Sequence, residues 1–152
     1  MSRPHRLLAA ATGPLSREDA QSIIDRTVKR SKADAIEVQL GSTYTGNTRF
    51  AANQMSTAGG VTDAQLAVQS SYGAKHAVVV TNDLSDESIA RVVQQSEALA
   101  KLAPDDPEAM PPLGAQTYPR VAAYFESTVN LSPADLAHAA MSALEPARAS
   151  ND

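Results

Sequence analysis

Apolar and polar residues alternate along two stretches of the chain. The alternation covers residues 34–41, returns at residues 65–69, and is followed by a β-branched run at residues 77–80. A period of two places successive side chains on opposite faces of a strand, so these stretches predict β-strands. Asn53-Gln54 and Tyr72-Gly73 are turn-forming pairs between the runs, and connections this short favour an antiparallel meander over parallel pairing.

Other turn-forming residues divide the first half of this region further. The polar stretch Ser42–Asn47 contains a glycine and predicts a turn or a mobile hairpin tip, after which Thr48–Ala52 predicts a new strand. Gly59-Gly60 predicts another turn or a bulge, because adjacent glycines have no side chains to fix a register. Together these signals predict a sheet of four to five strands.

Two stretches have the period of an amphipathic helix. Residues 17–31 begin after the capping residue Ser16, and residues 86–102 begin after Ser85 and end before Pro104. Both carry acidic residues in the first turn and an apolar stripe along one side. The predicted fold class is therefore α+β, with an antiparallel β-meander of four to five strands and two long helices packed on one face.

The chain is expected to divide into four parts. Residues 1–15 form a flexible leader, and residues 16–103 form the α+β domain. Residues 104–119 contain five prolines and several acidic residues and predict an extended connector. Residues 120–152 form a C-terminal helical segment that begins its clearest helix at Ser132-Pro133 and is expected to lead toward a further domain absent from this chain.

Composition and charge exclude several classes of function. The net charge of −4 gives no electrostatic footprint for nucleic acid, and no basic run would hold an anionic membrane surface. No cysteine is present, which excludes disulfides, thiolate metal sites and a cysteine nucleophile, and fits a cytoplasmic protein. The apolar run Leu7–Ala11 is shorter than the roughly 7–15 residues of a signal peptide's apolar region, so a cytosolic leader is favoured.

The sequence contains no self-sufficient catalytic motif. His5, His76 and His138 form no ligand pair at helical spacing, and nucleophile-elbow, P-loop and dinucleotide-binding patterns are absent. An acidic group in the connector offers a cation site, although carboxylates on a proline-rich loop are commonly solvated. The basic end of the first helix is either a phosphate-binding patch or, more simply, a complement to the helix dipole.

Several segments in a fixed order resemble the N-terminal domain of the TldD/PmbA family, zinc-dependent peptidases historically called modulators of DNA gyrase. The resemblance extends over about residues 16–142. It rests on the segments Ala35–Val38, Thr48–Ala51 with Asn53, the Gly73 turn, Thr81–Ser85 and Leu99–Pro107. Its most specific parts are the sequences RFA-x-N and TNDLS.

The resemblance implies a domain without catalytic or metal-binding residues of its own. In this family zinc is held by a larger C-terminal domain, which lies beyond this chain, so no cofactor is expected here. The implied partners are a homologous TldD/PmbA-type subunit or the missing C-terminal domain, with unfolded peptide as substrate. Whether the chain belongs to an enzyme is left open, since the family includes partner subunits without zinc ligands.

The candidate substrate or interface residues are Arg49, Phe50, Asn53 and Asn82. They lie in the segments that carry the resemblance, and an exposed strand around residues 49–53 would hold an extended peptide through its backbone. Arg49 would then meet a peptide carboxylate or an acidic group of a partner. The alternative is that Arg49 is a solvated residue of an edge strand and Asn53 a turn former.

Three functions remain open at this point. The first is the non-catalytic N-terminal domain of a TldD/PmbA-type zinc metallopeptidase, which supports subunit assembly and substrate access during proteolysis. The second is a free-standing adaptor that pairs with a separate peptidase subunit and is not an enzyme. The third is a truncated relic, whose last helix would expose an apolar stripe and cause aggregation.

Overall fold

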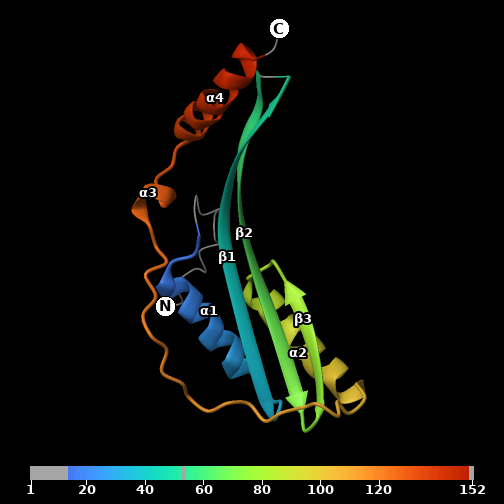
Figure 1. Ribbon diagram of the computed structural model, residues 1–152. Coiled ribbons are helices and arrows are strands. Elements are labelled where there is room, and N and C mark those ends of the chain that lie inside the picture. Colours follow the sequence, from blue (N-terminus) through green and yellow to red (C-terminus); the bar gives the residue numbers. More distant parts are fainter. Residues whose placement is uncertain (1–13, 53, 151–152) are drawn as a thin grey trace, which may run out of the picture. The chain divides into compact units, whose positions relative to one another are not determined.

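The computed structural model describes residues 14–52 and 54–150 (Figure 1). The described residues form two compact units. Residues 14–43 and 62–115 make the first unit, and residues 44–61 and 116–150 make the second. Two strands contribute residues to both units, and each unit is described here by itself.

The sheet has three strands in the order β1-β2-β3. They are β1 (Ala35–Ala51), β2 (Gln54–Tyr72) and β3 (Lys75–Thr81). β2 and β3 are antiparallel, in a register that runs without a break from Leu66 opposite Thr81 to Tyr72 opposite Lys75. Gly73 has φ of 57°, as the first loop residue of a type II′ hairpin turn requires.

The predicted α+β class and antiparallel sheet are confirmed, but the predicted number of strands is wrong. Ser42–Asn47 is not a turn, because β1 continues through it, and Gly59 and Gly60 lie inside β2. The physical reason is a contact between the two strands: a Cβ atom on Gly60 would lie 2.8 Å from Tyr44 Cε2. The tyrosine ring of β1 therefore packs over a glycine of β2. This contact holds the two strands together at a place where the glycines alone would predict a turn.

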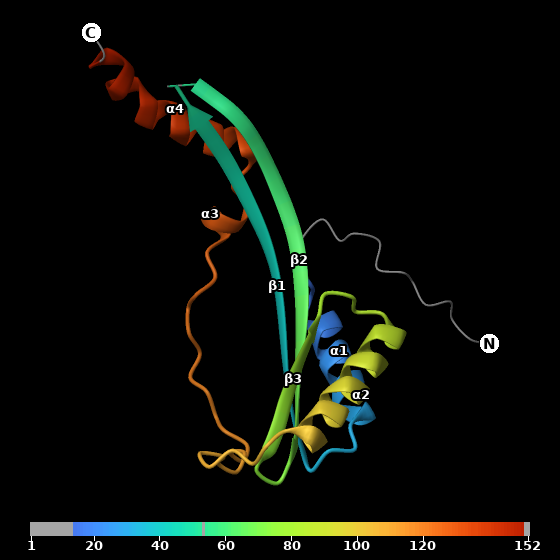
Figure 2. The ribbon, with the colours of Figure 1, turned by 90° about the vertical axis from the view of Figure 1, so that its right-hand side faces the viewer.

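Helix α1 (Arg17–Arg30) and helix α2 (Asp86–Leu102) cover one face of the sheet, as Figure 2 shows. Both begin where the sequence predicts. The Ser16 hydroxyl accepts a hydrogen bond from the Asp19 backbone N–H at 3.0 Å, and Ser85 accepts one from Ser88 at 3.3 Å. These caps satisfy backbone donors that a helix start otherwise leaves unpaired.

The core of the first unit lies between these helices and the sheet. Its buried apolar side chains come from α1, β2 and α2: Ile23, Leu66, Val68, Ile89, Val92 and Val93. Alternate residues of β1 and β3 pack against them. A buried polar pair joins strand to helix, because the hydroxyls of Ser70 and Ser96 lie 2.7 Å apart and Ser96 also donates to the Val93 carbonyl. The Ser70 and Ser96 hydroxyls are thus buried as a pair, whereas the Tyr72 hydroxyl is buried without a hydrogen-bond partner among the described residues.

The second unit combines the far half of the β1–β2 hairpin with the C-terminal helices. These are α3 (Glu126–Val129) and α4 (Pro133–Ala149); α4 begins at the start signal Ser132-Pro133 and adds a third long helix to the two predicted on the sheet. α4 begins with a capping box formed by Ser132 and Asp135. A Cβ atom on Gly46 would lie 3.8 Å from Leu136 Cδ1, which shows that α4 packs against the hairpin.

The connector between α2 and α3 contains neither helix nor strand. Its large apolar side chains are exposed, among them Met110 and Leu113 at 87% and Tyr118 at 81%. No helix among residues 14–52 and 54–150 is long and apolar enough to cross a membrane.

Replacing Leu66 by alanine tests the core. Leu66 is fully buried between β2 and the helices, so the variant Leu66→Ala is expected to lose about 2–5 kcal/mol of unfolding free energy in urea titration. The neighbouring exposed residue provides the control: Gln65→Ala should change stability by no more than about 0.5 kcal/mol. Equal effects of the two changes would contradict the described core.

Gly60→Ala tests the contact that joins the two long strands. The added methyl group would collide with the Tyr44 ring, so we expect lower stability and a change in tyrosine fluorescence. Gly41→Ala is the matched control, because nothing lies within 4 Å of a Cβ atom there and Gly41 belongs to the same hairpin. If Gly59-Gly60 formed a turn instead, Gly60→Ala and Gly41→Ala should have the same stability and tyrosine fluorescence.

Candidate functional site

Among the described residues of the first unit, no helix covers the face of the sheet opposite α1 and α2. We call it the open sheet face and define it by residues with side chains on that side of the three strands: Glu37, Gln39, Gln65, Ala67, Gln69, His76, Val78 and Val80. Val78 and Val80 are 53% and 48% exposed. They stand opposite Gln69 and Ala67 in the register. The open sheet face therefore carries an apolar strip on β3 beside polar side chains.

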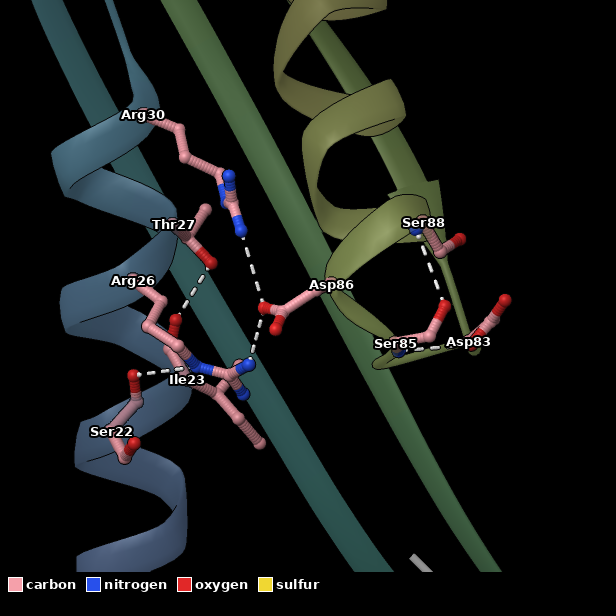
Figure 3. A network of polar contacts seen from close by, with 9 residues as sticks. All are labelled: Ser22, Ile23, Arg26, Thr27, Arg30, Asp83, Ser85, Asp86 and Ser88. Carbon is pink, nitrogen blue, oxygen red and sulfur yellow. Dashed lines mark hydrogen bonds and ion pairs between the residues drawn. The ribbon is translucent and has the colours of Figure 1, made fainter. Parts of the chain in front are cut away.

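On the covered side, an ion-pair network ties the two helices together (Figure 3). Arg26 Nη1 lies 2.5 Å from Asp86 Oδ1, and Arg30 Nη2 lies 3.2 Å from the same oxygen. Desolvation acts to raise the pKa of Asp86, but the charges and hydrogen bonds of Arg26 and Arg30 outweigh it, so its pKa lies below the usual 3.8. The last turn of α1 is thereby held at the first turn of α2.

The loop between β3 and α2 is ordered by its own polar groups. Asp83 Oδ1 accepts a hydrogen bond from the Ser85 N–H at 2.9 Å, and the Asp83 N–H donates to Thr81 Oγ1 at 3.1 Å. The hydrogen bonds from Ser85, first of all from its backbone, lower the pKa of Asp83. Asn82 is exposed within this rigid loop.

A cleft of about 700 Å³ lies along the outer side of the helices, lined by Arg30, Lys32, Glu97 and Lys101 together with neutral residues of α2. Its one carboxylate is engaged, because Glu97 Oε1 accepts hydrogen bonds from Ser31 Oγ and from the Lys32 N–H. Lys101 Nζ lies 4.8 Å from the centre of the Tyr72 ring. These contacts join helix ends and strand, and basic side chains on an exposed cleft do not by themselves make an anion site.

The structure places the predicted site residues in two different units. Arg49 and Phe50 are adjacent and exposed near the end of β1 in the second unit, and the Arg49 carbonyl accepts a hydrogen bond from Ser56 Oγ at 3.1 Å. Asn82 belongs to the first unit. Asn53 lies outside the described residues. The role predicted for these four residues stays a prediction.

The acidic connector contacts the sheet through Asp106, one of the acidic residues that the sequence offers as a cation site. The Asp106 N–H donates to the Ala74 carbonyl at 3.0 Å, and its Oδ2 lies 3.8 Å from His76 Nδ1. Asp106 Oδ1 accepts the Glu108 N–H at 2.9 Å. Within the part of the chain that the structure describes, no three His, Asp or Glu residues are grouped as metal ligands.

Comparison with known proteins agrees with this architecture. Residues 36–100 match the model of the family described as PmbA/TldA metallopeptidase domain 1. A crystal structure of TldE from Thermococcus kodakarensis superposes with a TM-score of 0.73 over 87% of this chain, at 15% sequence identity. The superposition covers 29% of the TldE chain, so this chain spans less than a third of that protein's length. No curated protein matches the sequence.

The matched stretch contains β1 from Ile36 onward, β2, β3 and most of α2, which together carry most of the core of the first unit. These elements define an α+β domain of a metallopeptidase family. The chain carries an N-terminal domain of the TldD/PmbA family, as the resemblance of its segments predicts.

The variant Asp86→Asn tests the ion-pair network by its pH dependence. Because the pKa of Asp86 is lowered in the folded protein, its stabilising effect is complete above the unfolded pKa near 3.8 and is lost as the pH falls through the folded value. Asp86→Asn should therefore be less stable than the wild type at pH 7, and the difference should shrink as the pH falls below about 4. The measurement is urea unfolding across this pH range.

Asp105→Asn, in the exposed connector, removes a carboxylate without disturbing the helix pair. At pH 7 its stability should lie within about 0.5 kcal/mol of the wild type. A stability deficit of Asp86→Asn that is the same at pH 3 and pH 7 would contradict the assigned role of its charge.

Proposed function

We propose that this chain is the non-catalytic N-terminal domain of a TldD/PmbA-type zinc metallopeptidase assembly. In this role the domain supports the association of subunits and the access of unfolded peptides to a proteolytic site held elsewhere. The observation that carries the proposal is the match of residues 36–100 to the family's first domain, combined with a sheet that this domain covers on one face only. The absence of cysteine fits a cytoplasmic location.

The exposed apolar surface supports the assembly part of the proposal. Val78 and Val80 are half exposed on the open sheet face, and the connector exposes several large apolar side chains. Exposed apolar side chains support a protein contact where they gather into one surface, as Val78 and Val80 do on β3. The occupant we infer is a homologous TldD/PmbA-type subunit or the larger domain of such a subunit.

The zinc chemistry of the assembly would belong to the homologous subunit or to its larger domain. The described residues offer no group of metal ligands, and Asp106, the central carboxylate of the connector, already holds the β2–β3 turn and the Glu108 N–H. The residues present therefore do not fit a zinc site. No step of peptide hydrolysis is assigned to this chain.

For substrate access, we infer a contact role for the exposed end of β1. Arg49 and Phe50 are consecutive residues of β1, so their side chains point to opposite faces of the strand, and the Phe50 side chain is 50% exposed. An extended peptide that meets this strand end would offer backbone groups to the strand and a carboxylate to Arg49. Asn53 and Asn82 remain candidates of the same kind.

The variant Arg49→Ala in the full assembly with a zinc-bearing subunit tests the access role. We expect a higher KM for peptides, with kcat nearly unchanged, because Arg49 would contact substrate away from the reacting bond. Arg17→Ala, in the exposed first turn of α1, is the matched loss of one arginine and should leave both constants as they are. Normal cleavage by Arg49→Ala would overturn the access role.

Co-purification tests the assembly role separately. The chain is expected to retain a zinc-bearing TldD/PmbA-type subunit, and a double change of Val78 and Val80 to serine should weaken that retention. Leu66→Ala, which disturbs the core and not the surface, distinguishes lost folding from lost contact. A chain that is folded and retains no such subunit would contradict the assembly role.

A further inference from the structure

The outer edge of β3 carries only part of the usual protection of an edge strand, namely Lys75 at its start. β3 is the last strand of the described sheet, so its outer side pairs with no other strand there. Figure 2 looks onto this edge, with α2 beside it. Natural edge strands are commonly shielded by proline, by a bulge or by inward charges. The segment KHAVVVT has no proline, and its register with β2 is unbroken over all seven residues.

The register identifies which backbone groups of β3 point outward. A two-residue turn joins Tyr72 to Lys75, and the pair that flanks such a turn is hydrogen-bonded. Hydrogen-bonded and non-hydrogen-bonded pairs then alternate along an antiparallel ladder. His76, Val78 and Val80 fall at the non-hydrogen-bonded positions, so their N–H and C=O groups face away from β2. The backbone N–H and C=O groups of these three residues can therefore form hydrogen bonds with another extended strand.

We propose that this edge pairs with β3 of a second copy of the chain, antiparallel and centred on Val78. β3 runs from residue 75 to residue 81, so pairing centred on residue 78 is the one symmetric register in which all seven residues overlap. The two sheets would join into one sheet of six strands. The interface is isologous, because the same surface is used by both copies, and it closes at a dimer.

The side chains of β3 are complementary to themselves in this register. Val78 meets its own equivalent, so the half-exposed valines at the symmetry axis cover one another, and Val80 meets His76 of the other copy. The two Lys75 side chains lie at opposite ends of the interface. Each stands beside residues 81–83 of the other copy, which end in the carboxylate of Asp83. No like charges face each other across the paired strands.

Helix α2 extends the apolar contact above the strands. Ser88 lies over the end of β3, where its hydroxyl is 3.3 Å from Thr81 Oγ1. Helical geometry places Leu99 on the same side of α2, eleven residues further on, and Leu102 close to it. Leu99 is 50% exposed and Leu102 83% exposed. The flank of α2 that would approach the second copy thus carries exposed leucines, whereas its flank toward α1 carries ion pairs.

This pairing requires no peptidase subunit and therefore goes beyond the proposed function. An extended peptide or a different subunit at the same edge would be an alternative occupant. The self-complementary register favours the second copy, because a peptide of arbitrary sequence would not place a valine opposite Val78 and an acidic residue close to Lys75.

Cysteine cross-linking of the purified chain tests the proposal, and the chain's lack of cysteine makes each introduced thiol unique. In the proposed register the two Val78 Cα atoms lie about 5.5 Å apart. The two Val80 Cα atoms are offset by four residues, or about 14 Å along the strand. A short bifunctional thiol reagent should therefore link Val78→Cys into a dimer and leave Val80→Cys unlinked. Circular dichroism melting would show that both variants fold.

Sedimentation of the unmodified chain completes the test and does not depend on any variant. We expect a dimer that Val78→Lys converts to monomer, since two like charges would meet at the symmetry axis. Gln69→Lys makes a similar change on the same sheet face, opposite Val78 but on the central strand, and should stay dimeric. A monomeric wild type, equal linking at both cysteines, linking at residue 80 alone or no linking would each overturn the proposal. A monomeric wild-type chain that still retains a zinc-bearing subunit would overturn the dimer alone, and a dimeric chain that retains none would overturn the assembly role alone, so the two proposals fail separately.

Discussion

The packing of α2 against β2 and β3 is the contact on which the first unit depends. Leu66 and Val68 point from the central strand toward Ile89 and the valines of α2, and these side chains are almost completely removed from solvent. With few aromatic residues in the chain, the core consists of aliphatic side chains of modest area, so each of them matters. The Arg26–Asp86 ion pair and the Ser70–Ser96 hydroxyl pair then fix the direction in which the helices lie.

Coverage of a single sheet face has a functional consequence. Both helices of the first unit pack on the same face of the sheet. Among the described residues, no other element covers Val78 and Val80 of β3 or the outer backbone groups of that strand. The proposed contact with another subunit is placed on this uncovered side. In the family to which residues 36–100 belong, this domain accompanies a larger part, as the 29% coverage of the TldE chain illustrates.

The sequence predicted the helix starts and the half-buried strands, because these depend on residues that are close together in the chain. Ser16 and Ser85 mark the helix starts, and the alternation around Ile36 and Leu66 marks the half-buried strands. The sequence could not predict that β1 continues through Ser42–Asn47, because its glycine and polar residues are typical of turns. The contact between Tyr44 and Gly60 that keeps the strands together joins residues distant in the chain. The partners of Asp86 lie 60 and 56 residues away, beyond any local pattern.

The central claim is that the chain is a non-catalytic domain of a zinc peptidase assembly, and the most direct test is made on the purified 152-residue chain alone. Zinc content by atomic emission and hydrolysis of unfolded peptides are measured on the same sample. The account predicts no stoichiometric zinc and no hydrolysis, with folding shown by circular dichroism. One bound zinc per chain, together with hydrolysis that a chelator abolishes, would contradict it.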